Sequence, residues 1–450
     1  MRKKLFGTDG IRGVANQYPM TAEVALRLGK SLAYTFRNTQ EIKTVLIGKD
    51  TRLSGYLLET ALTSGICSMG LDVSLVGPLP TPAVAHLTTS LNANAGIMIS
   101  ASHNPAQDNG IKVFTHKGIK LSDEKEREIE DVFFSNEIDS ALAPPHQIGK
   151  ARRLDSARGR YIEFAKSTTG YKDLSGLKVV IDCANGAAYS VAPQIFQELG
   201  VELIVIGNTP DGTNINLDCG ALHLDNLAAV VIEVGADAGL AFDGDSDRLM
   251  AVTDQGAFVN GDHIMALMAL DMKSKGQLCN DTLVTTVMSN IGLKILMREN
   301  QINVIETAVG DRYVHAIMSA NGYNLGGEQS GHLIFQDKTP TGDGIISGLQ
   351  LLSLLKDSGK PLSEMISVLR EAPQTLINID VTEKPEIDRI RGVPEAIQSA
   401  EQALGDEGRV LVRYSGTELI ARVLIEGPDE ELVSTRAHAI ADAIRAEIGA

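Results

Sequence analysis

The stretch SASHNPAQDNGIKVF, Ser100–Phe114, separates two apolar segments of the chain. The segment before it, Ala95–Ile99, has the composition of a buried β-strand. Serine, histidine, asparagine and proline then predict an exposed loop, and Asn109-Gly110 is a turn signal before the second apolar run. We therefore expect Ser102 at the tip of a strand–loop–strand unit, with an accessible hydroxyl and with Lys112 nearby to attract an anion. An ordinary surface turn has the same composition, so this stretch does not decide its own role.

Composition narrows the class of protein. The chain has 450 residues, which is typical of three or four domains, and 43% of them are hydrophobic. The formal net charge of −16 argues against nucleic acid as a partner, and an anionic ligand would need a local basic pocket. No apolar segment approaches the roughly 18 residues that a membrane-spanning helix needs, so we expect no membrane partner.

The chain carries features of a cytoplasmic protein. Its opening residues, MRKKLFGTDGIRG, are basic but lack a following apolar core, so they do not predict a signal peptide. The four cysteines are widely spaced and contain no CxxC pair, which favours reduced thiols and argues against a zinc site. These cysteines are Cys67, Cys183, Cys219 and Cys279.

Strand and helix patterns alternate along most of the chain, which predicts an α/β fold with covered sheet faces. The order of elements recurs in three regions, 1–150, 151–256 and 257–370, while the last region, 371–450, has fewer alternations. We expect three similar α/β domains with mixed sheets and a smaller C-terminal α+β domain. Helix patterns lie at Ala22–Phe36, Ser54–Met69, Ser122–Phe134, Ile291–Glu299, Leu362–Leu369 and Glu430–Ile448, and strand patterns at Thr44–Gly48, Lys178–Asp182, Thr282–Met288 and Arg409–Tyr414.

Three aspartates at alternate positions form the most specific single signal. Asp243, Asp245 and Asp247 lie in GLAFDGDSDRLMAV, between two apolar strands. Carboxylates this close repel one another unless a cation neutralises them, and oxygen ligands favour Mg²⁺, Ca²⁺ or Mn²⁺. An EF-hand is excluded because Arg248 and Asp254 stand where that loop needs glycine and glutamate. Mg²⁺ fits best because it leaves positions open for phosphate oxygens, and a solvated acidic turn is the alternative.

A loop in the last region has the composition of a phosphate cradle. Gly416 allows backbone N–H groups to form a concavity, and Arg413 offers a guanidinium fork to an oxyanion. Ser415 and Thr417 add hydroxyl donors, and Arg422 can reach the same place from the next strand. Ser-Gly-Thr is also a generic turn, so this loop is a weak signal by itself.

The third region has a polar loop of its own, Gly327–His332, with the sequence GEQSGH. Its polar side chains suit sugar hydroxyls. An imidazole titrates near neutral pH, so His332 is a candidate acid or base. A histidine in a glycine-rich loop is also a common surface residue, which leaves this role open.

These loops together resemble the α-D-phosphohexomutase family over essentially the whole chain. The resemblance rests on several motifs in the family's order. They are Phe6–Gly13 (FGTDGIRG), Ser100–Pro105 (SASHNP), Asp243–Arg248 (DGDSDR), Val309–Arg312 (VGDR), Gly327–His332 (GEQSGH) and Arg413–Glu418 (RYSGTE). The chain departs from the family pattern at Leu419, where the family commonly has proline, and at Ala421, where it has a large apolar residue. These positions affect the backbone beside the last motif but not its donors.

The resemblance implies four domains around a central cleft, three of them α/β and the last one smaller. It also implies the interconversion of glucosamine 6-phosphate and glucosamine 1-phosphate, for UDP-N-acetylglucosamine and cell-wall precursors. The phosphate would pass through a phosphoserine at Ser102 and a glucosamine 1,6-bisphosphate intermediate, with one Mg²⁺ per chain. The amino sugar is indicated by the chain length and by the glutamine of GEQSGH.

The same resemblance implies roles for single residues. The implied metal ligands are Ser102 as phosphoserine, Asp243, Asp245 and Asp247. The implied sugar ligands are Glu328 and Ser330. The implied ligands of the non-reacting phosphate are Arg413, Ser415, Gly416, Thr417 and Arg422. The implied catalytic residues are Ser102 as phosphate carrier and, as charge stabilisers or proton carriers, Arg12, Lys112, Arg248 and His332. The general base is not identified among them.

Other interpretations remain open. A phosphomannomutase or phosphoglucomutase of the same family would share these motifs. A sugar-phosphate phosphatase would share the acidic cluster and Mg²⁺ but would favour an aspartate nucleophile. A non-catalytic sugar-phosphate-binding protein would not need a phosphorylatable serine. The sequence does not determine the oligomeric state, and a homodimer stays open.

Overall fold

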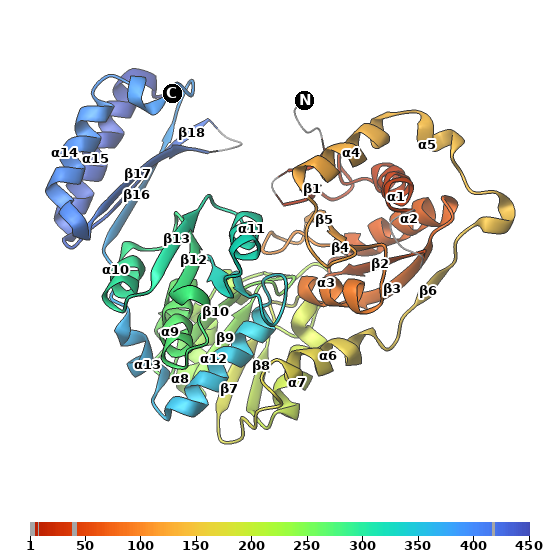
Figure 1. The fold of residues 1–450 in the computed structure, drawn as a ribbon, viewed down its shortest axis with the longest axis horizontal. Coiled ribbons are helices and arrows are strands. Elements are labelled where there is room, and N and C mark those ends of the chain that lie inside the picture. Colours follow the sequence, from red (N-terminus) through yellow and green to blue (C-terminus); the bar gives the residue numbers. More distant parts are fainter. Residues whose placement is uncertain (1–4, 8, 38–42, 416–418) are drawn as a thin grey trace. The chain divides into compact units, whose positions relative to one another are not determined.

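The structure is a computed structural model that describes residues 5–7, 9–37, 43–415 and 419–450. The chain forms two compact units, residues 1–287 with 305–366 and residues 288–304 with 367–450. Within the described residues the strands form four sheets, of six, five, four and three strands (Figure 1). Parallel and antiparallel pairs occur together in the first three sheets. The predicted class, three α/β domains with mixed sheets and a smaller C-terminal α+β domain, is confirmed.

The first sheet has the strand order β1-β5-β4-β2-β3-β6. On β2, Val45 and Ile47 join the apolar core that includes residues of α1, α2 and α4. Gly48 points to the opposite face, where a Cβ atom would lie 2.4 Å from Val84 of α3. The strands are β1 (Ile11–Val14), β2 (Thr44–Lys49), β3 (Asp72–Pro78), β4 (Ala95–Ile99), β5 (Asp108–Thr115) and β6 (Ala151–Arg153). The helices are α1 (Ala22–Phe36), α2 (Ser54–Ser68), α3 (Thr81–Ser90), α4 (Asp123–Phe134) and α5 (Glu137–Ser140).

The predicted turn at Asn109-Gly110 is wrong, because both residues lie inside β5. β5 is paired on both sides, with β1 and with β4, so sheet hydrogen bonds outweigh the local turn preference. The Asn109 side chain accepts a hydrogen bond from Gly110 N–H at 2.8 Å and donates to the Ser54 hydroxyl at 2.8 Å. Tertiary pairing therefore uses the asparagine as a strand residue.

The second sheet has the order β11-β10-β9-β7-β8 and carries the aspartate triad at one end. β9 and β10 are antiparallel neighbours, with Phe242 opposite Leu249, so the triad lies in their short connection. The strands are β7 (Lys178–Asp182), β8 (Glu202–Ile206), β9 (Ala238–Phe242), β10 (Leu249–Thr253) and β11 (Phe258–Val259). The helices are α6 (Ala157–Ser167), α7 (Ala192–Glu198) and α8 (Asp225–Val234).

The third sheet has the order β13-β12-β14-β15. β14 and β15 form a hairpin whose connection holds Glu328–His332. The strands are β12 (Thr282–Thr286), β13 (Asn303–Thr307), β14 (Leu325–Gly327) and β15 (Leu333–Phe335). The helices of this part of the chain are α9 (Gly261–Ser274), α10 (Ile291–Glu299), α11 (Asp311–Asn321), α12 (Gly344–Ser358) and α13 (Leu362–Met365).

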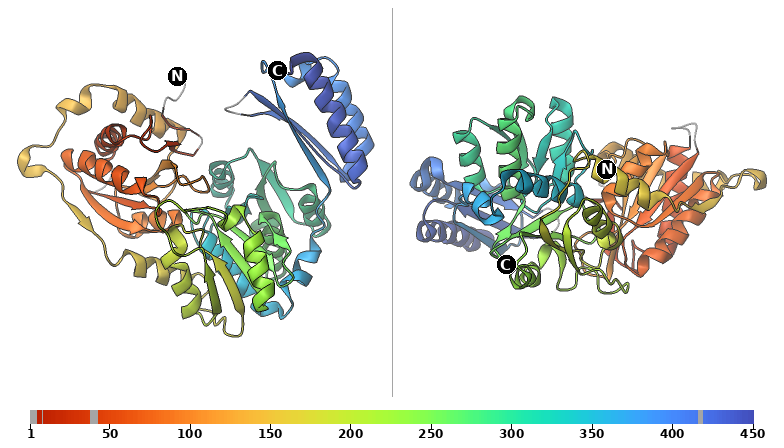
Figure 2. Two further views of the ribbon diagram at one scale, coloured as in Figure 1. Left: turned by 180° about the vertical axis from the view of Figure 1, so that it is seen from behind. Right: turned by 90° about the horizontal axis from the view of Figure 1, so that it is seen from below.

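The C-terminal sheet is antiparallel, with the order β16-β18-β17. α14 and α15 lie side by side on one face of it (Figure 2), and their apolar residues share one core with the strands. In the ladder of β17 and β18, Arg413 is directly opposite Arg422. The elements are β16 (Gln374–Asp380), β17 (Arg409–Tyr414), β18 (Ile420–Glu426), α14 (Val393–Leu404) and α15 (Glu430–Ile448).

The element predictions held where local periodicity was clear. α1, β7, α10, β17 and α15 have the predicted bounds. The helix predicted at Leu362–Leu369 is shorter, since α13 ends at Met365 and a 3₁₀ turn follows. α12 was not predicted, because its apolar residues surround most of the helix and leave little amphipathic signal. All four cysteines are free, and no helix in the described part of the chain is long and apolar enough to cross a membrane.

Candidate functional site

The loop between β4 and β5 carries Ser102 in a left-handed conformation, with a φ angle of 53°. The Ser102 N–H donates to the hydroxyl of Ser100 at 2.9 Å. Ser100 in turn donates to a carboxylate oxygen of Asp50 at 2.6 Å, and Asp50 is buried just after β2. This short chain of hydrogen bonds fixes the backbone that presents the Ser102 side chain.

A buried arginine holds the same loop. The Arg52 guanidinium is fully buried and donates to the carbonyls of Ser102 at 3.0 Å and Asn104 at 2.7 Å, and to the carbonyls of Pro105 in the loop and Asp108 at the start of β5. Its Nε donates to Asp50 at 2.8 Å. The positive charge of Arg52 can be buried because its N–H groups donate hydrogen bonds to oxygen atoms. The sequence analysis missed Arg52, although an Asp-Thr-Arg run directly after a buried strand was a usable signal.

Arg52→Lys is expected to lower kcat by about tenfold or more, because an ammonium group cannot satisfy all of these carbonyls at once. The Ser102 loop would then sample conformations in which the hydroxyl is misplaced. Steady-state kinetics and a thermal melt check this. Arg27→Lys is the matched control, since Arg27 also binds backbone carbonyls of this domain, at Phe133 and Ser135, away from Ser102. Equal kcat values for the two variants would contradict the expectation.

The predicted accessibility of Ser102 is wrong, since the residue is only 2% exposed. Two connections between strands of the second sheet cover it, one between β8 and β9 and one between β9 and β10. The Asn216 amide donates to the Ser102 carbonyl at 3.0 Å and to the Asn104 carbonyl at 2.9 Å. A Cβ atom on Gly244 would lie 2.6 Å from the Ser102 carbonyl, so only glycine allows this approach. The Ser102 hydroxyl therefore faces protein groups rather than bulk water.

The group that the Ser102 hydroxyl faces is the aspartate triad. Ser102 Oγ donates to Asp243 Oδ2 at 2.5 Å. Each of Asp243, Asp245 and Asp247 is buried, and each offers an oxygen that lies within 4.8 Å of the oxygens of the other two. The structure thus brings together a serine from a loop of the first sheet and three carboxylates from a connection of the second sheet.

The charges and orphaned atoms of the triad fit a cation. Burial, with Asp247 and Asp245 nearby, raises the pKa of Asp243 to about 8. Asp245 Oδ1 and Asp247 Oδ1 are buried and have no hydrogen-bond partner in the described part of the chain. A hard divalent cation prefers oxygen ligands. These two carboxylate oxygens, with the Asp243 carboxylate and the Ser102 hydroxyl beside them, offer such ligands. The residues therefore fit a metal ion.

Lys112 lies on β5 and balances part of this charge. Its Nζ donates to Asp245 Oδ2 at 2.8 Å and to Asp247 Oδ2 at 3.2 Å, and it lies 3.5 Å from Asp9. Burial acts to lower the pKa of Lys112, but these carboxylates outweigh it and raise the pKa well above its usual value. Lys112 therefore stays charged.

The other two predicted arginines also contact this group of residues. Arg12, on β1, forms an ion pair with Asp9 and donates to Asn104 Oδ1 at 3.5 Å. Arg248 donates its backbone N–H to Asp243 Oδ1 at 3.2 Å, and its Nε lies 3.9 Å from Asp247 Oδ1. Arg12 and Arg248 therefore bring positive charge to the Ser102 loop and to the triad.

The GEQSGH loop lies against β10, the strand that follows the aspartate triad. The Leu249 N–H donates to the Gly331 carbonyl at 2.9 Å, and Gly331 has a φ angle of 89°. His332 is buried, with its Nδ1 3.7 Å from Asp247 Oδ1. Glu328 accepts a hydrogen bond from the Gly310 N–H at 3.0 Å, and Ser330 is exposed. The loop predicted to bind sugar is thus adjacent to the triad.

A cluster that the sequence analysis missed links the first and third sheets. Lys120 Nζ lies 2.6 Å from carboxylate oxygens of both Asp9 and Asp311. Asp311 also lies 3.5 Å from His332 Nε2. Burial acts to lower the pKa of His332, but Asp247 and Asp311 outweigh it and raise the pKa above its usual value. Because the partners are far apart in the chain, no local pattern could have predicted this cluster.

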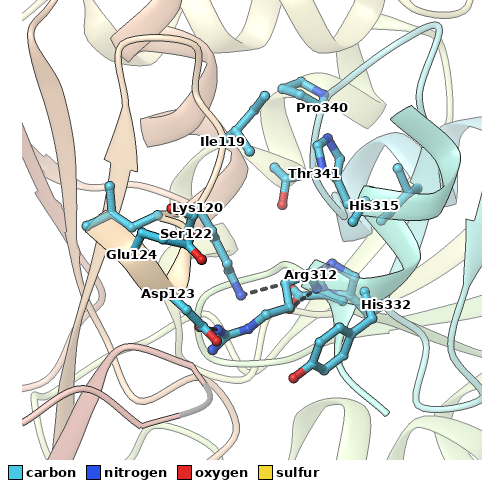
Figure 3. A pocket seen from close by; sticks show the side chains of 15 residues that line it. Ile119, Lys120, Ser122, Asp123, Glu124, Arg312, His315, His332, Pro340 and Thr341 are labelled. Carbon is cyan, nitrogen blue, oxygen red and sulfur yellow. Dashed lines mark hydrogen bonds and ion pairs between the residues drawn. The ribbon is translucent and has the colours of Figure 1, made fainter. Parts of the chain in front are cut away.

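Beside this cluster lies a cavity of about 350 Å³. Figure 3 shows it with Lys120, Arg312 and His332 among its lining residues. Its volume is within the range of small-molecule sites. Of the predicted site residues, His332 lines this cavity, so a small ligand there would contact the GEQSGH loop through His332, while Ser102 and the triad lie outside the lining.

The predicted phosphate residues lie in the second unit. Arg413 and Arg422 face one another across β17 and β18, and burial together with Arg422 lowers the pKa of Arg413. Like charges at such a pair repel, which makes the position favourable for an anion. Lys384 Nζ donates to the Ser415 carbonyl at 2.6 Å. Gly416 and Thr417 lie outside the described residues.

Four domain profiles of one known protein family match successive parts of the chain. Profiles of phosphoglucomutase/phosphomannomutase match it as alpha/beta/alpha domain I at residues 3–139, domain II at 159–256 and domain III at 260–372. The C-terminal domain of the same family matches residues 376–443. A solved structure of a Burkholderia thailandensis phosphoglucomutase/phosphomannomutase family protein has a TM-score of 0.82 at 25% identity, covering 98% of this chain and 97% of that one.

Relatives of known name match over the full chain. A phosphoglucosamine mutase of Syntrophotalea carbinolica is 53% identical, with 100% of this chain and 99% of the relative covered. A phosphoglucosamine mutase of Geotalea daltonii is 54% identical, with 99% of both chains covered. These matches agree with the motifs and with the assembled serine and aspartates. The chain therefore belongs to the phosphoglucomutase/phosphomannomutase family of phosphohexomutases.

Proposed function

We propose that this chain is an isomerase that interconverts glucosamine 6-phosphate and glucosamine 1-phosphate, for UDP-N-acetylglucosamine and cell-wall precursor synthesis. The observation that carries the chemistry is the Ser102 hydroxyl, 2.5 Å from Asp243 of a buried carboxylate triad. The choice of sugar is supported by relatives named phosphoglucosamine mutase at 53–54% identity over the whole chain.

Each phosphoryl transfer uses Ser102 as carrier. Starting from phosphoserine, the O1 hydroxyl of glucosamine 6-phosphate attacks phosphorus and its proton passes to a base, while the bond between phosphorus and Ser102 Oγ breaks and Oγ takes up a proton. The resulting 1,6-bisphosphate turns in the site. The Ser102 hydroxyl then attacks the phosphorus on O6 and gives up its proton to a base, while the O6–phosphorus bond breaks and O6 takes up a proton. Glucosamine 1-phosphate leaves, and Ser102 is phosphorylated again.

Asp243, Asp245, Asp247 and a phosphate oxygen on Ser102 would hold one Mg²⁺, which neutralises charge on the transferring group. Lys112, Arg12 and Arg248 stabilise the same charge from the protein side. The remaining residues act on the sugar and its proton. Glu328 and Ser330 bind sugar hydroxyls, and His332 carries a proton.

A distal phosphate is held by Arg413, Ser415 and Arg422, with Gly416 and Thr417 as further proposed ligands. The facing arginines support this, because an anion between them would relieve their repulsion. A guanidinium fork recognises the phosphate without regard to the sugar oxygen that carries it. One pocket can therefore serve both orientations of the bisphosphate.

Arg413→Ala is expected to raise the Michaelis constant for either monophosphate by about tenfold, because the variant loses one charge-assisted contact with the phosphate. It should also release more free glucosamine 1,6-bisphosphate during turnover, because the intermediate is held less tightly. Arg389→Ala is the control, since Arg389 lies in the same unit, pairs with Glu386 and is 76% exposed. If Arg413→Ala has the parental Michaelis constants for both monophosphates and releases no extra bisphosphate, the assignment of Arg413 as a phosphate ligand is wrong.

The substrate is tested by comparing kcat/KM for glucosamine, glucose and mannose phosphates in a coupled assay of the isomerised product. We expect the glucosamine phosphates to be preferred. A preference for glucose or mannose phosphate would instead make the chain a phosphoglucomutase or phosphomannomutase. Inorganic phosphate as the main product would indicate a phosphatase, which the buried Ser102 disfavours because water has little access to it.

The proposed domain boundaries lie near residues 150, 256 and 370. The strand β6, which begins at Ala151, pairs with β3 of the first sheet just after the boundary near residue 150.

We propose a cytoplasmic enzyme that binds small sugar phosphates and not nucleic acid, in line with its net charge of −16. Sedimentation of the purified chain would decide whether it forms a homodimer.

A further inference from the structure

We propose that Thr81 is a positioning residue of the metal site and acts through Asp245. This inference rests on the metal-dependent function proposed above. It concerns a side chain that none of the family motifs in the sequence contains. Thr81 would not touch the cation but would decide how one of its ligands is presented.

The contact between the two residues is double. The Thr81 hydroxyl donates to Asp245 Oδ2 at 2.5 Å, and the Thr81 backbone N–H donates to the Asp245 carbonyl at 2.9 Å. Thr81 is the first residue of α3, between two prolines, and has no exposed area. The contact joins residues 164 positions apart in the chain. A helix that packs on the first sheet thus fixes the middle aspartate of the triad.

The second oxygen of the same carboxylate is left open. Asp245 Oδ2 accepts from Lys112 Nζ at 2.8 Å as well as from Thr81, so two donors occupy it. Asp245 Oδ1 is buried and has no hydrogen-bond partner in the part of the chain that the structure describes. The carboxylate is therefore arranged to offer one oxygen, and not two, to a cation.

This arrangement favours Mg²⁺ over Ca²⁺. Mg²⁺ requires near-octahedral geometry with single oxygens, whereas Ca²⁺ accepts both oxygens of one carboxylate. Without the Thr81 hydroxyl, Asp245 can rotate so that both oxygens face the cation. Loss of a hydrogen bond to a ligand commonly weakens metal binding by about 10–100-fold. The loss of affinity should be larger for Mg²⁺ than for Ca²⁺, so the preference of the site for Mg²⁺ over Ca²⁺ should decrease.

The test is isothermal titration of metal-stripped, full-length protein with Mg²⁺ and, separately, with Ca²⁺. Thr81→Val, which keeps the shape and removes the hydroxyl, is expected to raise the Kd for Mg²⁺ about tenfold or more and the Kd for Ca²⁺ by less. Thr81→Ser keeps a hydroxyl and should bind both ions as the parent does. Thr88→Val is the matched control, because Thr88 is equally buried on α3 and its hydroxyl bonds to Val84 of its own helix.

Each outcome decides the proposal. Weaker Mg²⁺ binding in Thr81→Val alone, with a reduced preference over Ca²⁺, supports it. Equal weakening in Thr88→Val, or parental binding by Thr81→Val, overturns it while leaving the metal site intact. A parent chain that binds no Mg²⁺ overturns both the metal site and this inference. If Thr81→Val does not fold, Thr81→Ala compared with Thr81→Ser makes the same decision.

Discussion

Replacing Ser102 with alanine is expected to lower kcat for the mutase reaction by at least about a thousandfold, because the proposed carrier of the phosphoryl group is lost. The Ser102 hydroxyl is the group expected to carry the phosphate, since it donates to the Asp243 carboxylate at 2.5 Å. The measurement is turnover of glucosamine 6-phosphate in a coupled assay. Intact-protein mass spectrometry with peptide mapping should find one phosphate on Ser102 in the parent and none in the variant.

A suitable control is Ser64→Ala. Ser64 is an α2 serine whose hydroxyl bonds to the Thr60 carbonyl of the same helix at 3.0 Å. This variant should keep parental kcat and the phosphate on Ser102. A fully active Ser102→Ala enzyme would remove the phosphoserine from the mechanism. A fully active parent that carries no phosphate at this residue would do the same.

Removing the metal is expected to abolish turnover and to lower thermal stability. The buried carboxylates of Asp243, Asp245 and Asp247 would lose the charge that offsets their repulsion. A ligand at 100 times its Kd stabilises the folded state by about 2.7 kcal/mol, so the melting temperature should rise with added Mg²⁺. Asp245→Asn should weaken Mg²⁺ binding by about tenfold or more and should remove most of this rise.

The control for this experiment is Asp254→Asn. Asp254 accepts hydrogen bonds from the backbone N–H of Ser363 at 2.9 Å and from its hydroxyl at 3.0 Å, and it is not part of the triad. This variant should respond to Mg²⁺ as the parent does. Full activity of chelator-treated parent in metal-free buffer would contradict the metal assignment. A Mg²⁺-dependent rise in melting temperature that survives in Asp245→Asn would contradict the choice of ligand.

Much of the fold and part of the site were predictable because they depend on neighbours in the chain. The amphipathic period of Ala22–Phe36 and the apolar run Lys178–Asp182 predict their helix and strand without any distant contact. The triad was predictable for the same reason. Alternate spacing places three carboxylates on one short connection, where their repulsion already implies a cation.

Other features depended on contacts between residues that are far apart in the chain. Ser102 has the sequence of an exposed loop, yet Asn216 and Gly244 cover it after the second sheet folds. Asn109 has the sequence of a turn, yet pairing on both edges keeps it in β5. Burial and strand pairing are properties of the assembled layers, and a local pattern does not contain them.

The chain by itself therefore determined its elements, its family motifs and the residue types that carry the chemistry. Only the tertiary structure decided which charges neutralise one another. Lys112 meets Asp245 across 133 residues, Thr81 meets the same carboxylate across 164, and Lys120 meets Asp311 across 191. The physical reason is that a buried charge or hydrogen bond needs a partner within about 3 Å, whatever the separation along the chain.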